Sequence, residues 1–179
     1  MTKKEKSLLL ALALGDGCIQ KSKNPNYTGT GLQIIHCLKQ ESYLRYKADL
    51  VSKILEKPVN TQIFQNGKYP GCRFYAYHKY FKVLRKFLYK SNKKFIRRCL
   101  LNRLDPECIA IWYMDDGNVA LHKRGDIIHS REIYLNTYCT LEEAECIKVW
   151  FQEKYDITFR CAPSKGKYRM ICNTANAKK

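Results

Sequence analysis

The sequence predicts an α+β fold in which two αββαββα units follow one another as a pseudo-twofold tandem repeat, the second lacking its last helix. Two apolar segments, residues 9–17 and 109–117, each close on an Asp-Gly pair, and the second pair lies one hundred positions after the first. After each pair, the alternating patterns of strands and the 3.6-residue patterns of helices recur in the same order. A plan that occurs twice predicts two related small units.

The first unit is predicted to open with a helix that starts at Thr2. Thr2 and Glu5 have the spacing of a capping box, and the apolar residues 8–14 follow directly. Gly17 is expected to close this helix. The same stretch resembles a secretion signal because lysines precede the apolar run. The capping box favours the helix, and secretion would also leave an odd cysteine unpaired.

The rest of the first unit alternates between strand and helix patterns. The middle helix is amphipathic, with Leu44, Ala48, Val51 and Leu55 on one face. Short turn sequences rich in glycine and asparagine separate the predicted strands. The strands are predicted over residues 18–22, 31–37, 61–65 and 72–77, and the helices over residues 40–56 and 80–89.

The second apolar segment has the end signals of a helix. Asp105 offers an N-cap and Pro106 suits the first helical position. Gly117 stands where a helix end favours a residue that tolerates positive φ. The letters Tyr-Met-Asp-Asp at residues 113–116 also occur on a hairpin turn of reverse transcriptases, but the residues before them lack the alternation of a strand. We therefore expect a helix with two carboxylates at its C-terminal end, where the helix dipole disfavours negative charge and a bound cation would offset it.

The remainder of the second unit repeats the plan of the first. Thr140 and Glu143 form a second capping box, which opens a helix with Ala144, Ile147 and Phe151 on one face. The two strands before this helix are expected to be joined by a long loop. The strands are predicted over residues 118–121, 132–137, 157–163 and 167–173, the loop over residues 122–131, and the start of a last helix at residues 174–176.

The predicted halves are residues 1–90 and the C-terminally incomplete 105–179, joined by a linker at residues 91–104. Residues 1–100 hold 21 Lys and Arg against 5 Asp and Glu, whereas residues 101–179 hold 12 against 11. Such an excess of positive charge is typical of a polyanion-binding surface, and nucleic acid is the expected partner. A basic face that serves only solubility is the alternative. No membrane partner is expected, because no segment is long enough to span a bilayer.

Nine cysteines are scattered along the chain, and none has the Cys-x-x-Cys or Cys/His spacing of a zinc site. Reduced, mostly buried thiols are expected. The expected location is therefore an intracellular reducing compartment, either a bacterial or phage-infected cytoplasm or an organelle matrix, and secretion is not expected. The four histidines, His36 among them, show no metal or nucleophile spacing, so ordinary surface or core roles are expected for them.

The paired helices and the repeated plan resemble the LAGLIDADG homing endonucleases, in particular their single-chain members with two motifs. This resemblance covers nearly the whole chain. It implies a monomeric, site-specific double-strand DNA endonuclease that is encoded within an intron or another mobile element and recognises a long asymmetric target. The residues that carry it are Leu9, Leu12, Asp16 and Gly17 in the first motif, Ala110, Asp116 and Gly117 in the second, and the runs 112–117, 133–137 and 140–143.

The resemblance also implies a magnesium site at the two Asp-Gly pairs. Asp16 and Asp116 would be catalytic metal ligands, with Gly15 and Asp115 completing the metal site or supporting it. Carboxylates that converge repel each other, and divalent cations offset this repulsion while activating water. Mn²⁺ is expected to substitute for Mg²⁺, and Ca²⁺ to bind without supporting cleavage. Lys94 aligns with a catalytic basic residue of the family, with a plain phosphate contact as the alternative.

Contacts to DNA are expected from the strands and from the basic segment that follows the first unit. Alternate strand residues face one side of a sheet, and their polar groups can read base edges in a groove. The expected contact residues are Gln20, Lys21, Lys23, Gln33, Gln62, Arg73 and Tyr75 in the first unit, and Lys93, Arg97 and Arg98 after it.

Two other functions remain open on the same fold. One is an intron RNA maturase, for which intron RNA is the partner, and the other is a DNA-binding regulator that does not cleave. A regulator has no need of acidic residues at both helix ends, whereas this sequence has them. A reverse transcriptase is rejected, because it requires a much larger polymerase domain and a further upstream aspartate.

Overall fold

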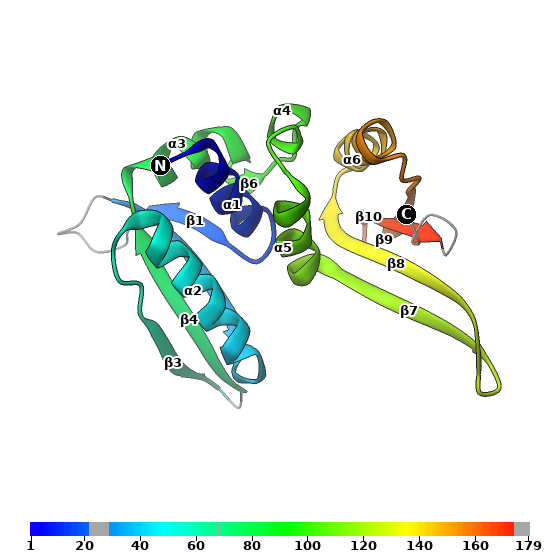
Figure 1. Ribbon diagram of the computed structural model, residues 1–179, viewed down its shortest axis with the longest axis horizontal. Helices are drawn as coiled ribbons and strands as arrows, with labels where there is room; N and C mark the ends of the chain where they lie inside the picture. Colours follow the sequence, from blue (N-terminus) through cyan, green and yellow to red (C-terminus); the bar gives the residue numbers. More distant parts are fainter. Residues whose placement is uncertain (22–28, 68, 174–179) are drawn as a thin grey trace. The chain divides into compact units, whose positions relative to one another are not determined.

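The computed structural model describes residues 1–21, 29–67 and 69–173, and Figure 1 traces the order of their helices and strands. The chain forms two compact units, Met1–Tyr89 and Lys90–Lys179. Each unit contains a four-stranded antiparallel sheet together with helices that pack on it. Among the described residues, no helix combines the length and the apolar character that crossing a bilayer requires.

In the first unit, the helices pack on one face of the sheet. Helix α2 packs on β2 and β4, and α3 packs on β1 and β2. The strand order is β1-β2-β4-β3. Leu32, Ile34 and Phe74 are fully buried and form the core side of the sheet. The elements are α1 (Lys3–Leu14), β1 (Cys18–Lys21), β2 (Thr30–Cys37), the 3-10 turn η1 (Leu38–Gln40), α2 (Glu41–Leu55), β3 (Thr61–Asn66), β4 (Tyr69–Tyr77) and α3 (Lys79–Leu88).

The second unit repeats this arrangement with the strand order β7-β8-β10-β9. Helix α6 packs on β9 and β10. The identical order of strands in both sheets confirms the predicted tandem α+β repeat. Residues 174–176, where the start of a last helix was expected, lie outside the described residues. The elements are β5 (Tyr89–Lys90), β6 (Lys93–Lys94), α4 (Arg98–Leu101), α5 (Pro106–Asp116), β7 (Gly117–Arg124), β8 (Ile127–Cys139), α6 (Leu141–Tyr155), β9 (Arg160–Ser164) and β10 (Lys167–Asn173).

The segment that was predicted to be a linker contains regular structure. Strands β5 and β6 form a two-stranded sheet, and α4 follows directly. The main-chain N–H of Ile96 donates a 2.7 Å hydrogen bond to Oε1 of Glu143. The other carboxylate oxygen of Glu143 accepts hydrogen bonds from the main chain and hydroxyl of Thr140, as the capping box predicts. One buried carboxylate therefore both caps α6 and holds this segment against it.

The prediction of a loop over residues 122–131 is wrong, because β7 and β8 continue as one long hairpin through that region. Only Gly125 and Asp126 form the turn, and Gly125 has a φ of +62°. A left-handed glycine at this point is what a two-residue hairpin turn requires. The charged and exposed side chains of this extension hide the alternation by which a half-buried strand is recognised in a sequence.

Equivalent positions in the two sheets differ in burial at their first strands. Ile19 of β1 is fully buried, whereas Val119 of β7, one hundred positions later, is 49% exposed. In the first unit α3 packs on β1, and the Tyr89 hydroxyl accepts a 2.9 Å hydrogen bond from the main-chain N–H of Ile19. Helix α3 therefore explains why the first strand of one sheet is covered while the corresponding part of β7 is exposed.

Candidate functional site

The apolar helix α1 places Asp16 at the surface of the first unit. Residues Leu8–Leu14 are all buried, and Thr2 caps the helix by accepting a 3.2 Å hydrogen bond from the N–H of Glu5. The last helical residue is Leu14, so the prediction that Gly17 closes the helix is wrong by two residues. Asp16 follows the helix in a tight turn, and its side chain is 37% exposed.

The glycine after each aspartate is required by close packing and not by positive φ. At Gly17 a Cβ atom would lie 2.4 Å from the carbonyl oxygen of Leu12, and at Gly117 it would lie 2.4 Å from that of Tyr113. The φ of Gly117 is −90°, so the expectation of a positive φ at this helix end is wrong. A side chain at either position would push the strand away from the helix and displace the aspartate.

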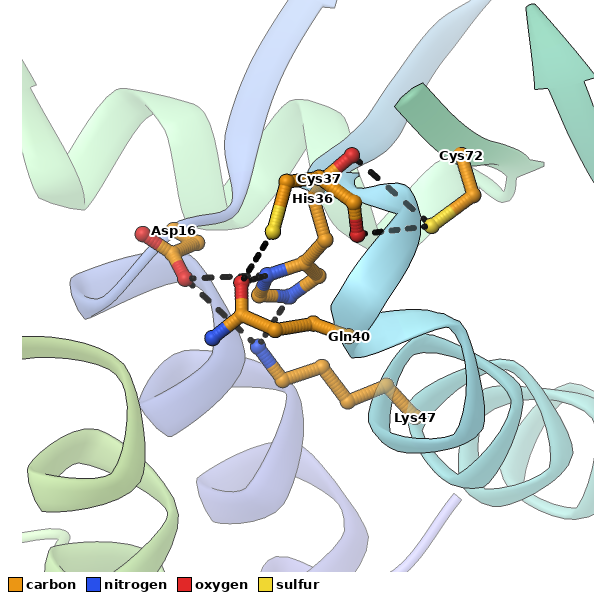
Figure 2. A network of polar contacts seen from close by, with 6 residues as sticks. All are labelled: Asp16, His36, Cys37, Gln40, Lys47 and Cys72. Atoms are coloured by element: carbon orange, nitrogen blue, oxygen red, sulfur yellow. Dashed lines mark hydrogen bonds and ion pairs between the residues drawn. The ribbon is translucent and has the colours of Figure 1, made fainter. Parts of the chain in front are cut away.

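In the first unit, Asp16 faces two basic side chains, which Figure 2 shows together with their partners. The Nδ1 atom of His36 lies 3.7 Å from Oδ2 of Asp16, and the Nζ atom of Lys47 lies 3.9 Å from the same oxygen. Lys47 and His36 also contact each other, with Nζ 3.0 Å from Nε2. Two elements distant in sequence, β2 and α2, thus bring an imidazole and an ammonium to the carboxylate that follows α1.

Lys47 is fully buried, which is unusual for a lysine. A buried ammonium is costly unless partners compensate for the lost water. Besides His36 and Asp16, the ring of Tyr43 lies under Nζ, with 4.2 Å from Nζ to the ring centroid. These contacts hold the ammonium in a defined place behind Asp16.

Sequence reasoning missed both basic residues of this network. His36 was assigned an ordinary role, but it is buried and faces Asp16. Lys47 follows Leu44 by three positions and precedes Val51 by four, so it stands in the apolar stripe of α2. A lysine in an apolar stripe was the available signal, because such a position predicts a buried charge that needs a partner.

The amide of Gln40 completes the network at the start of α2. Its Oε1 atom lies 3.1 Å from Nδ1 of His36, and it also accepts a hydrogen bond from the thiol of Cys37 at 3.6 Å. Figure 2 shows the amide oxygen directed at the imidazole of His36. The thiol of Cys72 donates to the main-chain oxygens of His36 and Cys37, which fixes the end of β2 that presents the imidazole.

In the second unit, Asp116 is held by a different set of groups. Asp105 caps α5 by accepting a 2.9 Å hydrogen bond from the N–H of Cys108, and Asp116 is the last helical residue. The indole N–H of the buried Trp112 donates a 2.9 Å hydrogen bond to Oδ2 of Asp116. The side-chain amide of Asn136 donates to the main-chain oxygen of Asp116 at 3.0 Å. The predicted helix is confirmed, and an indole N–H orients its terminal carboxylate.

The face of the first sheet opposite Ile34 and Phe74 is here called the first outer face. It brings together most of the contact residues predicted in the first unit. Gln20 donates a 2.6 Å hydrogen bond to Gln33, and Gln33 donates one of 2.6 Å to the hydroxyl of Tyr75. Arg73 lies beside Tyr75 on the same strand, and it pairs in register with Gln62 of β3. Its guanidinium stacks on the rings of Tyr75 and Phe64, at 5.3 Å and 4.9 Å.

Two predicted contact residues of the first unit do not join this face. Lys21 is the next residue after Gln20 in β1, so the pleat turns it to the opposite side. Lys23 lies outside the described residues.

The second sheet has a comparable polar face opposite Leu135 and Met170, here called the second outer face, which sequence reasoning did not identify. Glu132 accepts hydrogen bonds from Tyr134 at 2.7 Å and from Arg160 at 3.1 Å. These bonds lower the pKa of Glu132, and the bond to this carboxylate raises the pKa of Tyr134. Arg169 stacks on the ring of Tyr134 at 4.7 Å.

Each outer face thus carries an arginine on the matching strand, Arg73 on β4 and Arg169 on β10. Each stacks on a tyrosine of its own sheet, Tyr75 or Tyr134. In both arginines Nε is buried and has no hydrogen-bond partner within the described part of the chain. A guanidinium fixed by stacking is suited to bind the planar, acceptor-rich edges of bases or phosphates.

The basic segment between the two sheets in the sequence has a mixed character. Lys93 is exposed and Lys94 is half-buried in β6. Arg97 stacks on the ring of Phe95 at 5.5 Å. Arg98 forms an ion pair with Glu153 of α6 and donates a hydrogen bond to Asn102 at 3.3 Å, so its guanidinium already has partners within the second unit.

Each unit presents, where its apolar helix ends, oxygen donors of the kind that a hard divalent cation prefers. Asp16, Asp115 and Asp116 offer carboxylate oxygens, and Gly15 offers a main-chain oxygen. Oxygen ligands of this kind suit Mg²⁺, Mn²⁺ and Ca²⁺, whereas sulfur or imidazole sets favour zinc. Trp112 donates to Oδ2 of Asp116 and Lys47 faces Oδ2 of Asp16, which is the kind of contact that outer partners of metal ligands make. These residues therefore fit the predicted metal.

Comparison with solved structures shows the same fold. The homing endonuclease I-WcaI bound to its DNA recognition sequence matches with a TM-score of 0.79 at 22% identity, over 99% of this chain and 78% of that one. The structure of I-DmoI in complex with DNA and Mn matches with a TM-score of 0.54 at 14% identity, over 95% of this chain and 89% of that one.

Sequence comparison finds relatives of higher sequence identity than these structures, and a matching family. Protein RecA of Mycobacterium gastri is 31% identical over 121 residues, which make up 66% of this chain and 27% of the relative. Protein RecA of Mycolicibacterium chitae is 30% identical over the same shares. The chain thus spans 27% of the length of these curated relatives. The model of the LAGLIDADG DNA endonuclease family matches residues 6–179. Since this match covers nearly the whole chain, the protein belongs to the LAGLIDADG DNA endonuclease family.

Proposed function

We propose that this protein is a site-specific endonuclease that hydrolyses both strands of duplex DNA with a divalent metal. The observation that supports this most directly is an arrangement that occurs in both units. In each unit an apolar helix leads to an aspartate whose Oδ2 faces side-chain donors. These donors are Lys47 and His36 at Asp16, and Trp112 at Asp116. Each of these aspartates belongs to a unit whose sheet has a polar outer face.

The two outer faces would bind the DNA grooves. On the first outer face, Gln20, Gln33 and Tyr75 form a hydrogen-bonded row, and Arg73 stacks beside it. Amide and guanidinium groups recognise base edges in the major groove. The second outer face carries a different set, centred on Glu132. Two unlike faces favour a long asymmetric target, and the net charge of +17 favours binding to phosphates.

Asp16 and Asp116 would hold the cations, with Gly15 and Asp115 completing the ligand set. When bound, Mg²⁺ would lower the pKa of a water molecule and neutralise charge on the phosphate oxygens. Trp112 keeps Oδ2 of Asp116 directed by its 2.9 Å hydrogen bond. Lys94 would place its ammonium on the scissile phosphate and stabilise the negative charge of the transition state. The exposed Lys93, with Arg97, would contact the DNA backbone nearby.

The known relatives support this proposal. I-WcaI was solved bound to its DNA recognition sequence, and I-DmoI was solved in complex with DNA and with Mn or Ca. We further propose that this chain acts as a monomer, because its two units each supply one acidic helix end. The fully or partly buried free cysteines favour an intracellular, reducing location.

A cleavage selection tests the proposal. A library of randomised duplexes would be incubated with the protein and Mg²⁺, and the cut ends sequenced. The expected result is cleavage of both strands at one long sequence with Mg²⁺ or Mn²⁺, and binding without cleavage with Ca²⁺. Asp16→Asn and Asp116→Asn should bind the selected duplex with salt-dependent affinity but not cut it.

The same assay separates the other functions open on this fold. Salt-dependent binding of one duplex without cutting under any metal would overturn the endonuclease and indicate a non-cleaving DNA-binding protein. Tighter binding to structured intron RNA than to any duplex would indicate a maturase. Cutting that persists in both aspartate variants would contradict the catalytic assignment.

A further inference from the structure

The contact between Lys47 and His36 determines how protons are placed in the network at Asp16. An ammonium has only donors, so the Nε2 atom of His36, 3.0 Å from Nζ, must be the acceptor. The carboxylate of Asp16 lies 3.9 Å from Nζ and the ring centroid of Tyr43 lies 4.2 Å from it, and both groups attract an ammonium. His36 therefore carries its proton on Nδ1, which is the ring nitrogen that faces Asp16.

The proton on Nδ1 of His36 orients the side chain of Gln40. The Nδ1–H of His36 donates to Oε1 of Gln40 at 3.1 Å, and the thiol of Cys37 donates to the same oxygen. An amide whose oxygen accepts two hydrogen bonds has its NH₂ group directed to the other side. The orientation of the Gln40 amide thus follows from the proton on Nδ1 of His36, whose other ring nitrogen accepts from Lys47.

The second unit lacks this arrangement at the corresponding place. Helices α2 and α6 have the same length and begin one hundred positions apart, so Lys47 corresponds to Ile147. Both side chains are fully buried. Helix α6 fills the position with a hydrocarbon, and Asp116 is oriented from its own helix by Trp112.

We propose that Lys47 is a positioning residue of the first unit, which holds the His36 imidazole and the Asp16 carboxylate in place for cleavage of one of the two DNA strands. This inference rests on the proposed function, because it assigns a role within that reaction. Lys47 does not touch the DNA in this account. It acts through His36, and its loss affects one strand more than the other.

The first test measures the tautomer without DNA or metal. The protein has four histidines, so the ¹⁵N and ¹³C signals of its imidazoles can be assigned one by one at a pH where they are neutral. His78 is an internal reference for the opposite tautomer, because its Nδ1 atom accepts a 3.1 Å hydrogen bond from the N–H of Tyr80. His36 should show the Nδ1–H form in both proteins, because Nδ1 faces Gln40 and Asp16. The signal of the acceptor Nε2 should move in Lys47→Met, because this nitrogen loses its donor. An Nε2 signal that stays unchanged in Lys47→Met would overturn the proposal.

The second test follows each strand of the selected duplex separately. Lys47→Met keeps the length of the side chain, and the Asp16 carboxylate that loses its partner is 37% exposed, so it is not left as a buried unpaired charge. Lys47→Gln serves as a second variant, and thermal unfolding checks that both are folded. One strand should be cut about 10- to 100-fold more slowly, as for other outer partners of metal ligands. The other strand should be cut at its normal rate.

Ile147→Met is the matched control, because it places the same side chain at the same helical position of the second unit. It conserves volume and should leave both strand rates unchanged. Normal cutting of both strands by Lys47→Met would overturn the proposal, and so would equal slowing of both. If the natural protein cuts no duplex, the proposed function fails, whereas the tautomer measurement still decides the link between Lys47 and His36.

Discussion

Lys47 and Ile147 occupy the same position in two repeated helices and are both fully buried, yet one carries a charge and the other does not. The repeat therefore preserves the packing of the two units but not their electrostatics. In the first unit the lysine lies 3.9 Å from the carboxylate of Asp16. In the second unit a tryptophan N–H contacts Asp116 instead. Corresponding aspartates of the two units thus face different groups, an ammonium in the first unit and an indole N–H in the second.

The hydrogen bond from Trp112 to Asp116 predicts a specific loss in Trp112→Phe. This change removes the N–H donor but keeps an aromatic ring in the core. Cleavage is expected to fall about 10- to 100-fold, because Oδ2 of Asp116 loses the group that directs it. Single-turnover cleavage with excess protein measures the effect, and DNA binding should be retained.

Trp150→Phe is the control for that variant. Trp150 is equally buried, but its indole N–H has no hydrogen-bond partner in the part of the chain that the structure describes. The two variants lose similar volume, so they should lose similar stability. If Trp150→Phe reduces cleavage as much as Trp112→Phe, the effect comes from packing and the role of the Trp112 donor is refuted.

The close approach at Gly17 predicts that even alanine is not tolerated there. Its Cβ would lie 2.4 Å from the carbonyl oxygen of Leu12 and 2.8 Å from the side chain of Leu32. Gly17→Ala should lower the free energy of unfolding by about 1–3 kcal/mol, the usual cost of overpacking. Urea unfolding measures this loss. Gly67→Asn is the control, because asparagine tolerates the φ of +57° at this turn and nothing lies within 4 Å. Equal stability of the two variants would contradict the packing argument.

The lowered pKa of Glu132 predicts a contribution to stability that depends on pH. Its causes are the hydrogen bonds from Tyr134 and then from Arg160. Because the folded pKa lies below the ordinary value of 4.5, this contribution is complete above that pH and disappears as the pH falls through the folded pKa. The unfolding temperature should therefore fall less between neutral and acid pH in Glu132→Gln than in the natural protein. Parallel curves would refute the role of this carboxylate.

The burial of the thiols predicts which cysteines react with an alkylating reagent. Burial raises the pKa of Cys108 to about 12 and that of Cys161 to about 11, so both are almost entirely protonated at neutral pH. Cys18, Cys37 and Cys99 are exposed. Mass spectrometry after brief iodoacetamide treatment should find these three labelled and Cys108 unlabelled. Rapid labelling of Cys108 in the folded protein would contradict its buried position.

Much of the fold could be predicted from the sequence because local signals and the repeat agree. The capping boxes at Thr2 and Thr140 mark helix starts that the structure confirms. The proline after Asp105 decides between a helix and a hairpin for the second motif. The long extension of β7 and β8 was missed, because exposed residues on both faces leave no alternation to detect.

The candidate site was only partly visible in the sequence. The Asp-Gly pairs identified Asp16 and Asp116, but the partners of these residues come from distant segments. His36 and Lys47 reach Asp16 only because β2 and α2 fold against the end of α1. Trp112 lies one helical turn before Asp116, a spacing that does place two side chains on one face. That spacing was a usable signal, whereas the contact of Lys47 required the tertiary structure.

The central claim is that Asp16 and Asp116 together hold divalent cations against the backbone of a DNA duplex. A crystal structure of the protein bound to its selected target, grown with Mn²⁺, tests it directly through anomalous scattering. The account predicts manganese peaks in contact with both carboxylates and with the phosphates at the two cut positions. Carboxylates that lie apart from each other, or manganese bound elsewhere on the complex, would contradict it.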